Sequence, residues 1–243
     1  MEIASIEHAT TEDDLTKVGR FRYRIYVEEM KRFQQYADHA ARTVCEPLDR
    51  SGHVLIALQG SEVVGTVRFN LGSESDLGLY TELYRLKELG PLFPKRVSIT
   101  TKLMIAPEYR RTPLALRLAL ASYKYASVRG VDVDAIDCNP PLKSFFAKLG
   151  YRQVFGAIDH PEYGHVIPMF LAVRDKQHLQ QVRSPFLKLA ESLDHDWESA
   201  DLLNALAELY QPSSTQPVVS KAVVNDGPRP ERSLEIFRES ENS

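Results

Sequence analysis

The residues best placed to do chemistry lie in one segment, residues 103–115, which reads LMIAPEYRRTPLA. An apolar run ends at Pro107, a turn with Arg110 and Arg111 follows, and a long helical pattern opens at Pro113. The first turn of a helix leaves backbone N–H groups unpaired and carries a partial positive charge, and Pro is favoured at its first position. Two arginines beside such a helix start are typical of a site for a phosphate or another anion.

A second set of polar residues lies near the N-terminus, in the segment RYRIYVEE. Arg22, Tyr26 and Glu29 fall at i, i+4 and i+7, so a helix would place them on one face. Charged side chains usually face water, and a solvated charged helix is therefore the alternative interpretation of the same pattern.

The pattern of apolar residues, caps and turns predicts the elements that would position these residues. Thr10 or Thr11, followed by three acids, starts a helix that runs to about Met30 or Phe33. A helix over 113–128 has a core-facing stripe, which we expect to be Leu114, Leu118, Ala121, Tyr125 and Val128. The other expected elements are a strand within 2–8, a hairpin of strands 54–58 and 63–69, a short helix over 77–89, a strand over 96–105, a strand over 131–139, a helix over 142–149, and two paired strands over 151–158 and 165–173, with residues 34–50 irregular. This order predicts an α+β domain with a mixed sheet.

The composition narrows the class of protein. The chain has 243 residues, 43% hydrophobic and 26% charged, as is ordinary for a globular protein. The net charge of −3 argues against broad binding of nucleic acid or anionic membranes. Cys45 and Cys138 show neither a disulfide framework nor metal-site spacing, so we expect no bound metal and a cytoplasmic location. The N-terminus lacks the apolar segment of a signal peptide, and no apolar run approaches the roughly 18 residues of a membrane span.

Two segments together resemble the GCN5-related N-acyltransferases. LMIAPEYRRTPLALRLALASYKYA is similar to the acyl-carrier motif of that superfamily, and NPPLKSFFAKLGYRQV is similar to the segment that follows it. The resemblance implies a mixed, largely antiparallel sheet flanked by helices, an acyl thioester donor and no other bound cofactor. It implies that backbone N–H groups of Met104 and Ile105 stabilise the oxyanion of the reaction. It also implies a donor-binding set, which here is Leu103, Arg110, Arg111, Thr112, Pro113, Leu114, Ala115 and Asn139.

Two residues depart from the superfamily's pattern. Pro113 stands where a glycine is expected, which removes one N–H donor from the turn that binds the pyrophosphate of coenzyme A. A donor with a single phosphodiester, such as phosphopantetheine on acyl carrier protein, asks less of that turn. Phe146 stands where many members carry a Tyr that protonates the leaving thiolate, so water, another group or unassisted departure must serve instead.

The N-terminal half is similar to two groups that take acyl chains from acyl carrier protein, the acyl-homoserine-lactone synthases and the N-acyl amino acid synthases. Arg22 with Tyr26, the acid pair Glu46 and Asp49, and Arg68 match the lactone synthases. The chain lacks their Trp after the first helix, and Lys102 replaces an Arg before the motif strand. The segment DHPEYGHVIPMFLAVRDKQHL is more similar to the N-acyl amino acid synthases.

The resemblance covers roughly residues 15–185 and predicts an N-acyltransferase domain over 1–185. The apolar stripes and composition of the rest predict a helical extension over 186–211 and a tail over 212–243 that is rich in Pro, Ser and charge. The expected reaction moves a medium- or long-chain fatty acyl group from acyl carrier protein to the amine of an amino acid or a similar acceptor. The alternatives are an acyl-homoserine-lactone synthase, which requires S-adenosylmethionine, an acetyltransferase that uses acyl-coenzyme A, and a non-catalytic module that binds the acyl carrier.

An acceptor with a carboxylate needs a cation, and Arg binds carboxylates with two hydrogen bonds. The expected acceptor-binding residues are Arg22, Tyr26, Asp49 and Arg68, and Glu29 and Asp49 are both candidate bases. The alternative for both arginines is a structural ion pair with Glu46, Asp49 or Glu29, because buried charges are normally paired. We expect His160 and His165 to be structural or exposed, and Cys138 to be a buried thiol, since direct transfer needs no nucleophile.

Overall fold

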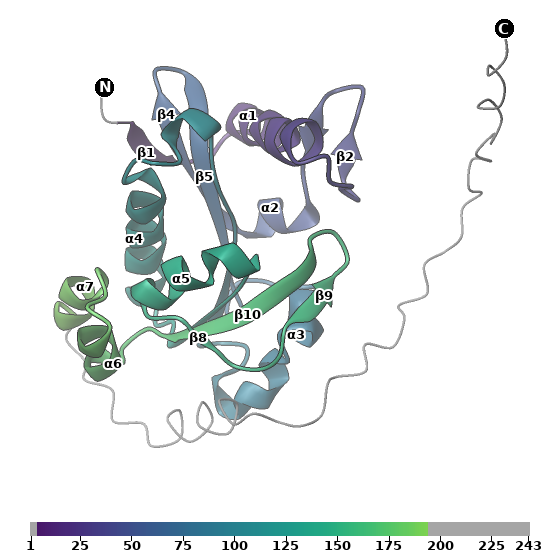
Figure 1. Cartoon of the computed structure of the whole chain (residues 1–243). Helices are drawn as coiled ribbons and strands as arrows, with labels where there is room; N and C mark the ends of the chain where they lie inside the picture. The colour runs from purple at the N-terminus through teal and green to yellow at the C-terminus, as the bar shows by residue number, and fades with distance from the viewer. Residues whose placement is uncertain (1–3, 194–243) are drawn as a thin grey trace, which may run out of the picture. The chain divides into compact units, whose positions relative to one another are not determined.

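The centre of the structure is a sheet in which helices cover both faces (Figure 1). The computed structural model describes residues 4–193. The strands of the sheet lie in the order β1-β4-β5-β6-β7-β10-β8, and β9 pairs with β10. Every neighbouring pair is antiparallel except β6 and β7, which are parallel. The strands are β1 (Ser5–His8), β4 (His53–Gln59), β5 (Glu62–Leu71), β6 (Val97–Ile105), β7 (Val133–Cys138), β8 (Arg152–Gln153), β9 (Ile158–His160) and β10 (Gly164–Ala172), and a separate hairpin pairs β2 (Ala37–Asp38) with β3 (Thr43–Val44). This is the mixed, largely antiparallel sheet expected from the sequence.

The helices divide between the two faces of the sheet. On β5, Val67 and Phe69 point to the face that α4 covers, and Arg68 points to the face that α1 and α2 cover. Because both faces are covered, every residue of β5 after Glu62 is buried. The helices are α1 (Glu12–Tyr23), the π-helix η1 (Arg24–Glu29), α2 (Pro47–Ser51), α3 (Tyr80–Leu83), the 3₁₀ helices η2 (Leu86–Leu92), η3 (Pro107–Tyr109) and η4 (Pro140–Leu142), α4 (Leu114–Ser127), α5 (Lys143–Leu149), α6 (Lys176–Gln181) and α7 (Leu187–Glu191).

Two irregularities of β6 shape the centre of the sheet. First, β6 and β7 pair only from Val97 to Ile99, and beyond that point the two strands diverge. Second, Thr101 pairs with Arg68 and Met104 with Thr66, so two residues of β6 oppose one residue of β5. This is a β-bulge, and Lys102 within it has a left-handed backbone with φ of 56°. The bulge directs Lys102 toward the interior of the protein, beside the gap between the diverging strands.

The first helix is shorter than the sequence predicts. The capping box at Thr11 is present, but the α-helix ends at Tyr23 and continues as a π-helix to Glu29. In the wider turn the N–H of Met30 donates to the carbonyl of Ile25 at 2.9 Å, five residues back. The polar face read from an α-helical period is therefore not continuous. Its three residues contact different partners, which are described with the site.

The stripe predicted on the helix over 113–128 is partly wrong. Leu114 and Leu118 are buried as expected, but Val128 is 64% exposed, and Ala121 and Tyr125 are only half-buried. The face buried against the sheet is shifted by one position and is Leu114, Leu118, Ala119, Ser122, Tyr123, Ala126 and Ser127. Tyr123 stacks on Phe186, which precedes α7, with 4.3 Å between ring centroids. The side of α4 that is buried is thus the one that packs on the sheet and on Phe186.

Some segments are more regular than expected, and others lie outside the described residues. Residues 34–50 contain β2, β3 and α2 rather than irregular chain, and the single helix expected over 77–89 is α3 followed by η2. The expected boundary at 185 falls between α6 and α7 and stays a prediction. The helical pattern beyond residue 193 and the tail over 212–243 lie outside the described residues.

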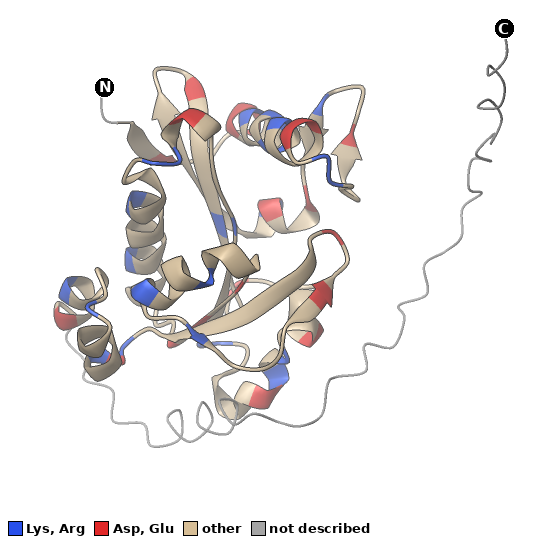
Figure 2. Cartoon of the chain, in the orientation of Figure 1, with Lys and Arg blue, Asp and Glu red and all other residues tan. Residues whose placement is uncertain are grey.

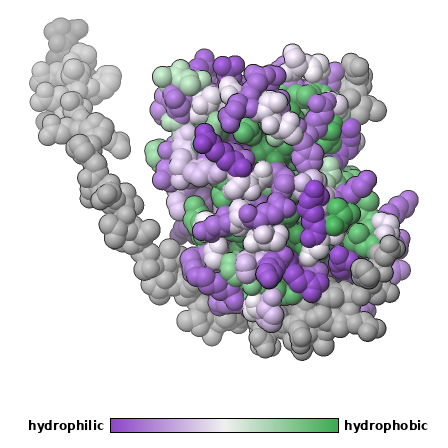
Figure 3. All heavy atoms as spheres, turned by 180° about the vertical axis from the view of Figure 1, so that it is seen from behind, coloured by the Kyte–Doolittle hydropathy of each residue, from purple (hydrophilic) through white to green (hydrophobic). Residues whose placement is uncertain are grey.

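Within residues 4–193, no helix is long and apolar enough to cross a membrane. Seen from behind, the surface is a mixture of hydrophilic and hydrophobic residues (Figure 3).

Gly72 lies where the end of β5 meets the start of β6. Its N–H donates to the carbonyl of Val97 at 2.9 Å, and a Cβ there would come within 2.4 Å of the Pro94 carbonyl oxygen. We expect Gly72→Ala to lower the free energy of unfolding by about 1–3 kcal/mol, because backbone must move to relieve the overlap. Gly156→Ala is the control, since a Cβ at Gly156 meets nothing within 4 Å. Urea denaturation of both variants checks this, and equal stabilities would contradict it.

Candidate functional site

A cavity of about 260 Å³ opens where β6 and β7 diverge. One part of its wall is apolar and includes Leu103, Ile136, Cys138, Leu142 and Phe146. Another part is polar and includes Tyr80, Thr101, Lys102, Asp137 and Tyr163. The π-helix contributes Tyr26 and Glu29, and Arg110 and Asn139 lie on the wall from the two loops that follow β6 and β7. The cavity thus brings residues from five separate segments of the sequence into one site.

The turn before α4 uses several of its own N–H groups internally. The N–H of Thr112 donates to the carbonyl of Tyr109 at 3.0 Å, and that of Leu114 donates to Thr112 Oγ1 at 3.3 Å. Pro113 has no N–H, and the first intrahelical bond runs from Arg117 to Pro113 at 3.0 Å. The N–H groups that remain for an anion are therefore those of the first helical turn, Ala115 and Leu116. The role of this turn in donor binding stays a prediction.

Arg110 and Glu29, expected in different parts of the site, form an ion pair. The two guanidinium nitrogens of Arg110 lie 2.6 and 2.7 Å from the two carboxylate oxygens of Glu29. The Nε of Arg110 also donates to the carbonyl of Ile105 at 3.1 Å. Arg111, the second arginine of the turn, is exposed. The ion pair ties the end of the π-helix to the motif strand at the edge of the cavity.

The strand register distinguishes the two N–H groups proposed for the oxyanion. Met104 pairs with Thr66, and the N–H of Ala106 donates to the carbonyl of Val64 at 2.9 Å. Because hydrogen-bonded and non-hydrogen-bonded pairs alternate along antiparallel strands, Met104 points its N–H toward β5 and Ile105 points its N–H away from β5. Of the two, Ile105 is the one directed at the gap beside β7. The register favours Ile105 for a role that stays a prediction for both.

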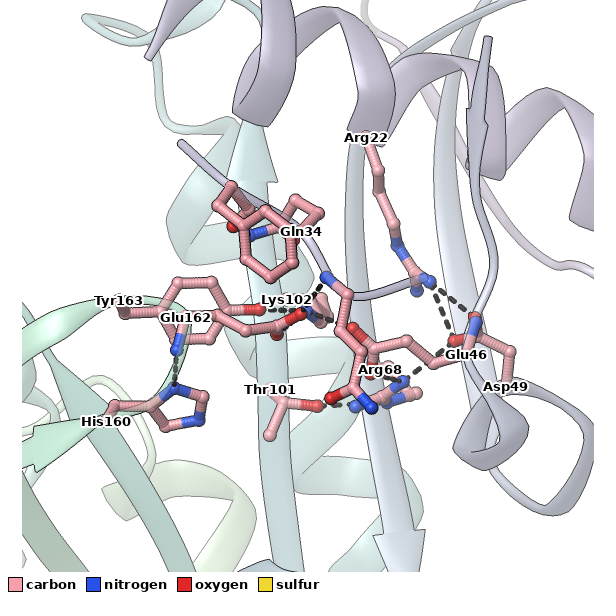
Figure 4. A network of polar contacts seen from close by, with 12 residues as sticks. Arg22, Gln34, Glu46, Asp49, Arg68, Thr101, Lys102, His160, Glu162 and Tyr163 are labelled. Carbon is pink, nitrogen blue, oxygen red and sulfur yellow. Dashed lines mark hydrogen bonds and ion pairs between the residues drawn. The ribbon is translucent and has the colours of Figure 1, made fainter. Parts of the chain in front are cut away.

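The arginines expected to bind an acceptor lie in a buried ion cluster, shown in Figure 4. Arg22 Nη1 donates to both carboxylate oxygens of Asp49 at 2.7 Å. Arg68 Nη1 lies 2.7 Å from Glu46 and 3.0 Å from Asp49, and Lys102 pairs with Glu46 on its other oxygen. Arg22 and Arg68 are 0% exposed. Both arginines therefore form the structural ion pairs that were the alternative to acceptor binding. A direct contact of either arginine with an acceptor stays a prediction.

Charges in the cluster shift one another's pKa. Burial alone would raise the pKa of Asp49, but Arg22 and Arg68 outweigh it and lower that pKa to about 2. Burial lowers the pKa of Lys102, and the charges of the two arginines lower it further, whereas the charge of Glu46 opposes the shift. Three donors of the cluster, Arg22 Nε and Nη2 and Arg68 Nη2, are buried without a hydrogen-bond partner among the described residues. The charges lie where α1, α2 and the central strands meet (Figure 2).

Tyrosines line the cavity around Lys102. Tyr26 stacks on Tyr163 with 5.4 Å between centroids, and Lys102 Nζ lies 5.0 Å and 4.8 Å from the two ring centroids. Lys102 also hydrogen-bonds the hydroxyl of Tyr163, and Glu162 reaches it only at 4.0 Å. Lys102 is therefore the member of the cluster that lines the cavity. In the sequence, the only sign that Lys102 belongs to the site was that it replaces an expected Arg. No motif pointed to Tyr163.

Asp137 is a further residue of the cavity wall that the sequence motifs did not single out. It follows Ile136 on β7 and accepts a hydrogen bond from the hydroxyl of Tyr84 at 2.8 Å. Burial raises its pKa to about 6, and the bond from Tyr84 and the charge of Lys102 oppose a larger rise. The only sequence sign was its place two residues before Asn139, whose side-chain oxygen accepts from Arg32 at 3.3 Å.

The remaining candidates lie outside the chemistry of the cavity. His160 is buried, accepts from the N–H of Glu162 at 3.1 Å, and has its pKa lowered to about 4 by burial. His165 is exposed beside Asp159. Cys138 is a buried thiol whose pKa burial raises to about 11. Across residues 4–193, no group of three or more His, Cys, Asp or Glu side chains could hold a metal ion.

Comparisons with known proteins agree with this architecture. A family model described as N-acyl amino acid synthase FeeM matches residues 17–172. The solved structure of FeeM, from uncultured soil microbes, superposes with a TM-score of 0.58 at 16% identity, over 76% of this chain and 97% of FeeM. MesI, a CoA-dependent acyl-homoserine lactone synthase, gives a TM-score of 0.56 at 19% identity, over 80% of this chain and 100% of MesI. Escherichia coli ElaA gives 0.52 at 13% identity, over 70% of this chain and 99% of ElaA. A search of curated protein sequences gives no match.

Removing one carboxylate from the cluster should be costly. We expect Asp49→Asn to lower the free energy of unfolding at pH 7 by about 3–5 kcal/mol, because Arg22 keeps a buried charge without its partner. Asp159→Asn is the control, since the Asp159 side chain is 91% exposed, and we expect a change within about 0.5 kcal/mol. Urea denaturation measures both.

The same variant has a defined pH dependence. The pKa of Asp49 is lowered from 3.8 to about 2 on folding, so its contribution to stability is present above pH 3.8 and is lost as the pH falls through 2. The difference between wild type and Asp49→Asn should therefore shrink below about pH 4. A difference that stays constant down to pH 2 would contradict the ion-pair assignment.

Proposed function

Because the chain belongs to the FeeM family of N-acyl amino acid synthases, we propose that it moves a medium- or long-chain fatty acyl group from acyl carrier protein to the amine of an amino acid or a similar acceptor. Membership of this family makes the chain an N-acyltransferase. One observation carries the proposal: a single cavity joins Arg110, the residue of the turn before α4 that lines it, to a polar pocket around Lys102. A thioester arm and an amine can therefore meet between β6 and β7.

The turn before α4 supports a carrier protein as the donor. Two of its N–H groups are bonded internally, and Pro113 supplies none. Such a turn offers few donors to the two phosphates of coenzyme A, whereas a phosphopantetheine arm carries one phosphodiester, and the carrier protein adds contacts of its own. At the cavity, Met30 and Leu142 are 39% and 47% exposed, which gives an acyl chain an apolar entry.

The polar pocket supports an acceptor that carries a carboxylate. Lys102 lines the cavity, and Glu162 is at the limit of ion-pair distance from it, 4.0 Å. A carboxylate of the acceptor would take the place beside Lys102 that Glu162 fills only loosely. Arg22 and Arg68 lie behind Lys102 and add positive potential without entering the cavity. The aromatic rings of Tyr26 and Tyr163 would then flank the acceptor.

The chemistry follows from this placement. The amine nitrogen attacks the thioester carbonyl, and the oxyanion that forms needs a positioned donor, for which the Ile105 N–H is directed at the gap. The carbon–sulfur bond then breaks and the amide is released. Phe146 lines the cavity but has no proton to give to the departing thiolate.

An acyl-homoserine-lactone synthase is the second candidate. The observation that favours it is the ion cluster, because Arg22, Glu46, Asp49 and Arg68 match that group's residues and do meet in one place. The two reactions differ in their requirement for S-adenosylmethionine. Product formation without that compound excludes the second candidate.

The test is a direct assay with product detection by mass spectrometry. Purified protein is incubated with acyl carrier protein or coenzyme A thioesters of several chain lengths and with a panel of amino acids. We expect N-acyl amino acids, a preference for the carrier-protein donor and no need for S-adenosylmethionine. A strong preference for short acyl-coenzyme A would overturn the choice of donor, and binding of the carrier with no product would favour a non-catalytic module.

A single substitution should change the choice of donor. Pro113 has φ of −66°, which Ala adopts without strain, so Pro113→Ala restores one N–H and little else. We expect kcat/KM with acyl-coenzyme A to rise about tenfold, the value of one hydrogen bond to a charged group of about 1.5 kcal/mol, with a smaller change for the carrier-protein donor. Pro107→Ala, in the same loop but before the turn, is the matched control and should change neither. An unaltered donor ratio in Pro113→Ala would show that the missing N–H does not select the donor.

A further inference from the structure

Two carboxylates of the described residues line the cavity, Glu29 and Asp137, and their environments differ. Both oxygens of Glu29 are engaged by the guanidinium of Arg110, at 2.6 and 2.7 Å. Both oxygens therefore already accept a charge-assisted hydrogen bond, and one of these bonds would have to break before Glu29 could contact an amine directly in its place. The residue expected from the sequence as a candidate base is therefore poorly suited to the role.

Asp137 has one oxygen held and one available. Its Oδ2 accepts from the hydroxyl of Tyr84 at 2.8 Å, which fixes the orientation of the carboxylate. Its Oδ1 has no hydrogen-bond partner among the described residues. It is also absent from the set of fully buried atoms without a partner, so it is not completely enclosed by protein. Since Asp137 lines the cavity, that oxygen is open to a molecule bound there.

The position of Asp137 in the sheet also suits a reaction at the gap. The last residue of β7 that pairs with β6 is Ala135, and Asp137 lies two residues further, on the same face of the strand. That face packs against α3 and η2, so Tyr84 can reach the carboxylate. Ile105 of β6 lines the same cavity with its N–H directed at the gap. A thioester carbonyl bound at Ile105 would have Asp137 across the gap from it.

The charges around Asp137 keep it ionised yet basic near neutral pH. Burial raises its pKa to about 6, and Tyr84 and Lys102 limit the rise. A base with a pKa near the working pH combines the correct ionisation state with useful proton affinity. The titratable groups that interact with it are Tyr80 from α3, Tyr84 just after α3, Tyr26 from the π-helix, Lys102 from β6 and its neighbour Cys138.

We propose that Asp137 is the general base of the acyl transfer and that Tyr84 is its positioning residue, an inference that rests on the proposed function. As the amine nitrogen bonds to the carbonyl carbon, Asp137 Oδ1 takes one proton from that nitrogen. The carbon–sulfur bond breaks and its electron pair leaves on sulfur. Asp137 then returns the proton to the thiolate. One carboxyl group therefore acts first as the base, which Glu29 does not supply, and then as the acid, which Phe146 does not supply.

The first test is Asp137→Asn, which keeps the shape of the side chain and an acceptor for Tyr84. We expect kcat with the carrier-protein donor to fall about 10²-fold or more, with little change in KM for either substrate. The wild-type rate should fall on the acid side of pH 6, and the variant should lose that limb. Asp159→Asn, which lies outside the cavity, is the matched control. Retention of kcat within about threefold, or of the acid limb, would overturn the proposal.

Stability separates this role from a structural one. The pKa of Asp137 is raised from 3.8 to about 6 on folding, so its favourable contribution is present below pH 3.8 and is lost as the pH rises through 6. Asp137→Asn should therefore melt no lower than wild type at pH 7, and its advantage should grow between about pH 4 and pH 6. A variant that is both inactive and less stable at pH 7 would point to a structural residue instead.

Two more variants complete the test. Tyr84→Phe removes the bond that lowers the pKa of Asp137, so the acid limb should move to higher pH while KM is retained. Glu29→Gln should keep the acid limb where it is, because Glu29 is not the base. If the limb instead moves with Glu29 and not with Tyr84, the assignment is wrong. If wild type acylates no amine in the panel, the proposed function fails and this inference falls with it.

Discussion

The buried ion cluster is the constraint on which the rest of this structure depends. Moving charged groups out of water costs several kcal/mol per ion and is tolerated only when each has a partner. The charges of the cluster pair with one another across four elements: Arg22 from α1, Glu46 and Asp49 from the start of α2, Arg68 from β5 and Lys102 from β6. None of these elements can shift without leaving a buried charge unpaired.

The same cluster explains the bulge that shapes the cavity. Lys102 has a left-handed backbone, which costs on the order of 1 kcal/mol for a residue with a Cβ. The conformation places the ammonium group beside Glu46 and the two tyrosine rings, and these contacts compensate for the strain. The extra residue also sets the register that directs Ile105 toward β7. Charge pairing on one face of the sheet and an available N–H at the gap are therefore two results of one irregularity.

Two aspartates show how the fold gives one side chain opposite properties. Asp49 and Asp137 are both removed from most solvent, and burial alone would raise both pKa values. Two arginines lie against Asp49, so its pKa falls to about 2 and it remains a fixed charge. At Asp137 burial outweighs the opposing hydrogen bond from Tyr84 and charge of Lys102, so its pKa rises to about 6. The first holds elements together, and the second is able to exchange a proton near neutral pH.

The sequence by itself determined the main helices and strands and the family, because apolar periodicity, caps and the two motif segments are local properties of the chain. It also identified the turn at Arg110 and the residues of the ion cluster. It did not determine that Glu29 is held by Arg110, that β6 bulges at Lys102, or that Asp137 lines the cavity beside Tyr84. These depend on contacts between residues that are 81 and 53 positions apart, and on a register between strands. Only the tertiary structure decides them, because ionisation and hydrogen bonding in a buried site are set by neighbours in space and not by neighbours in the chain.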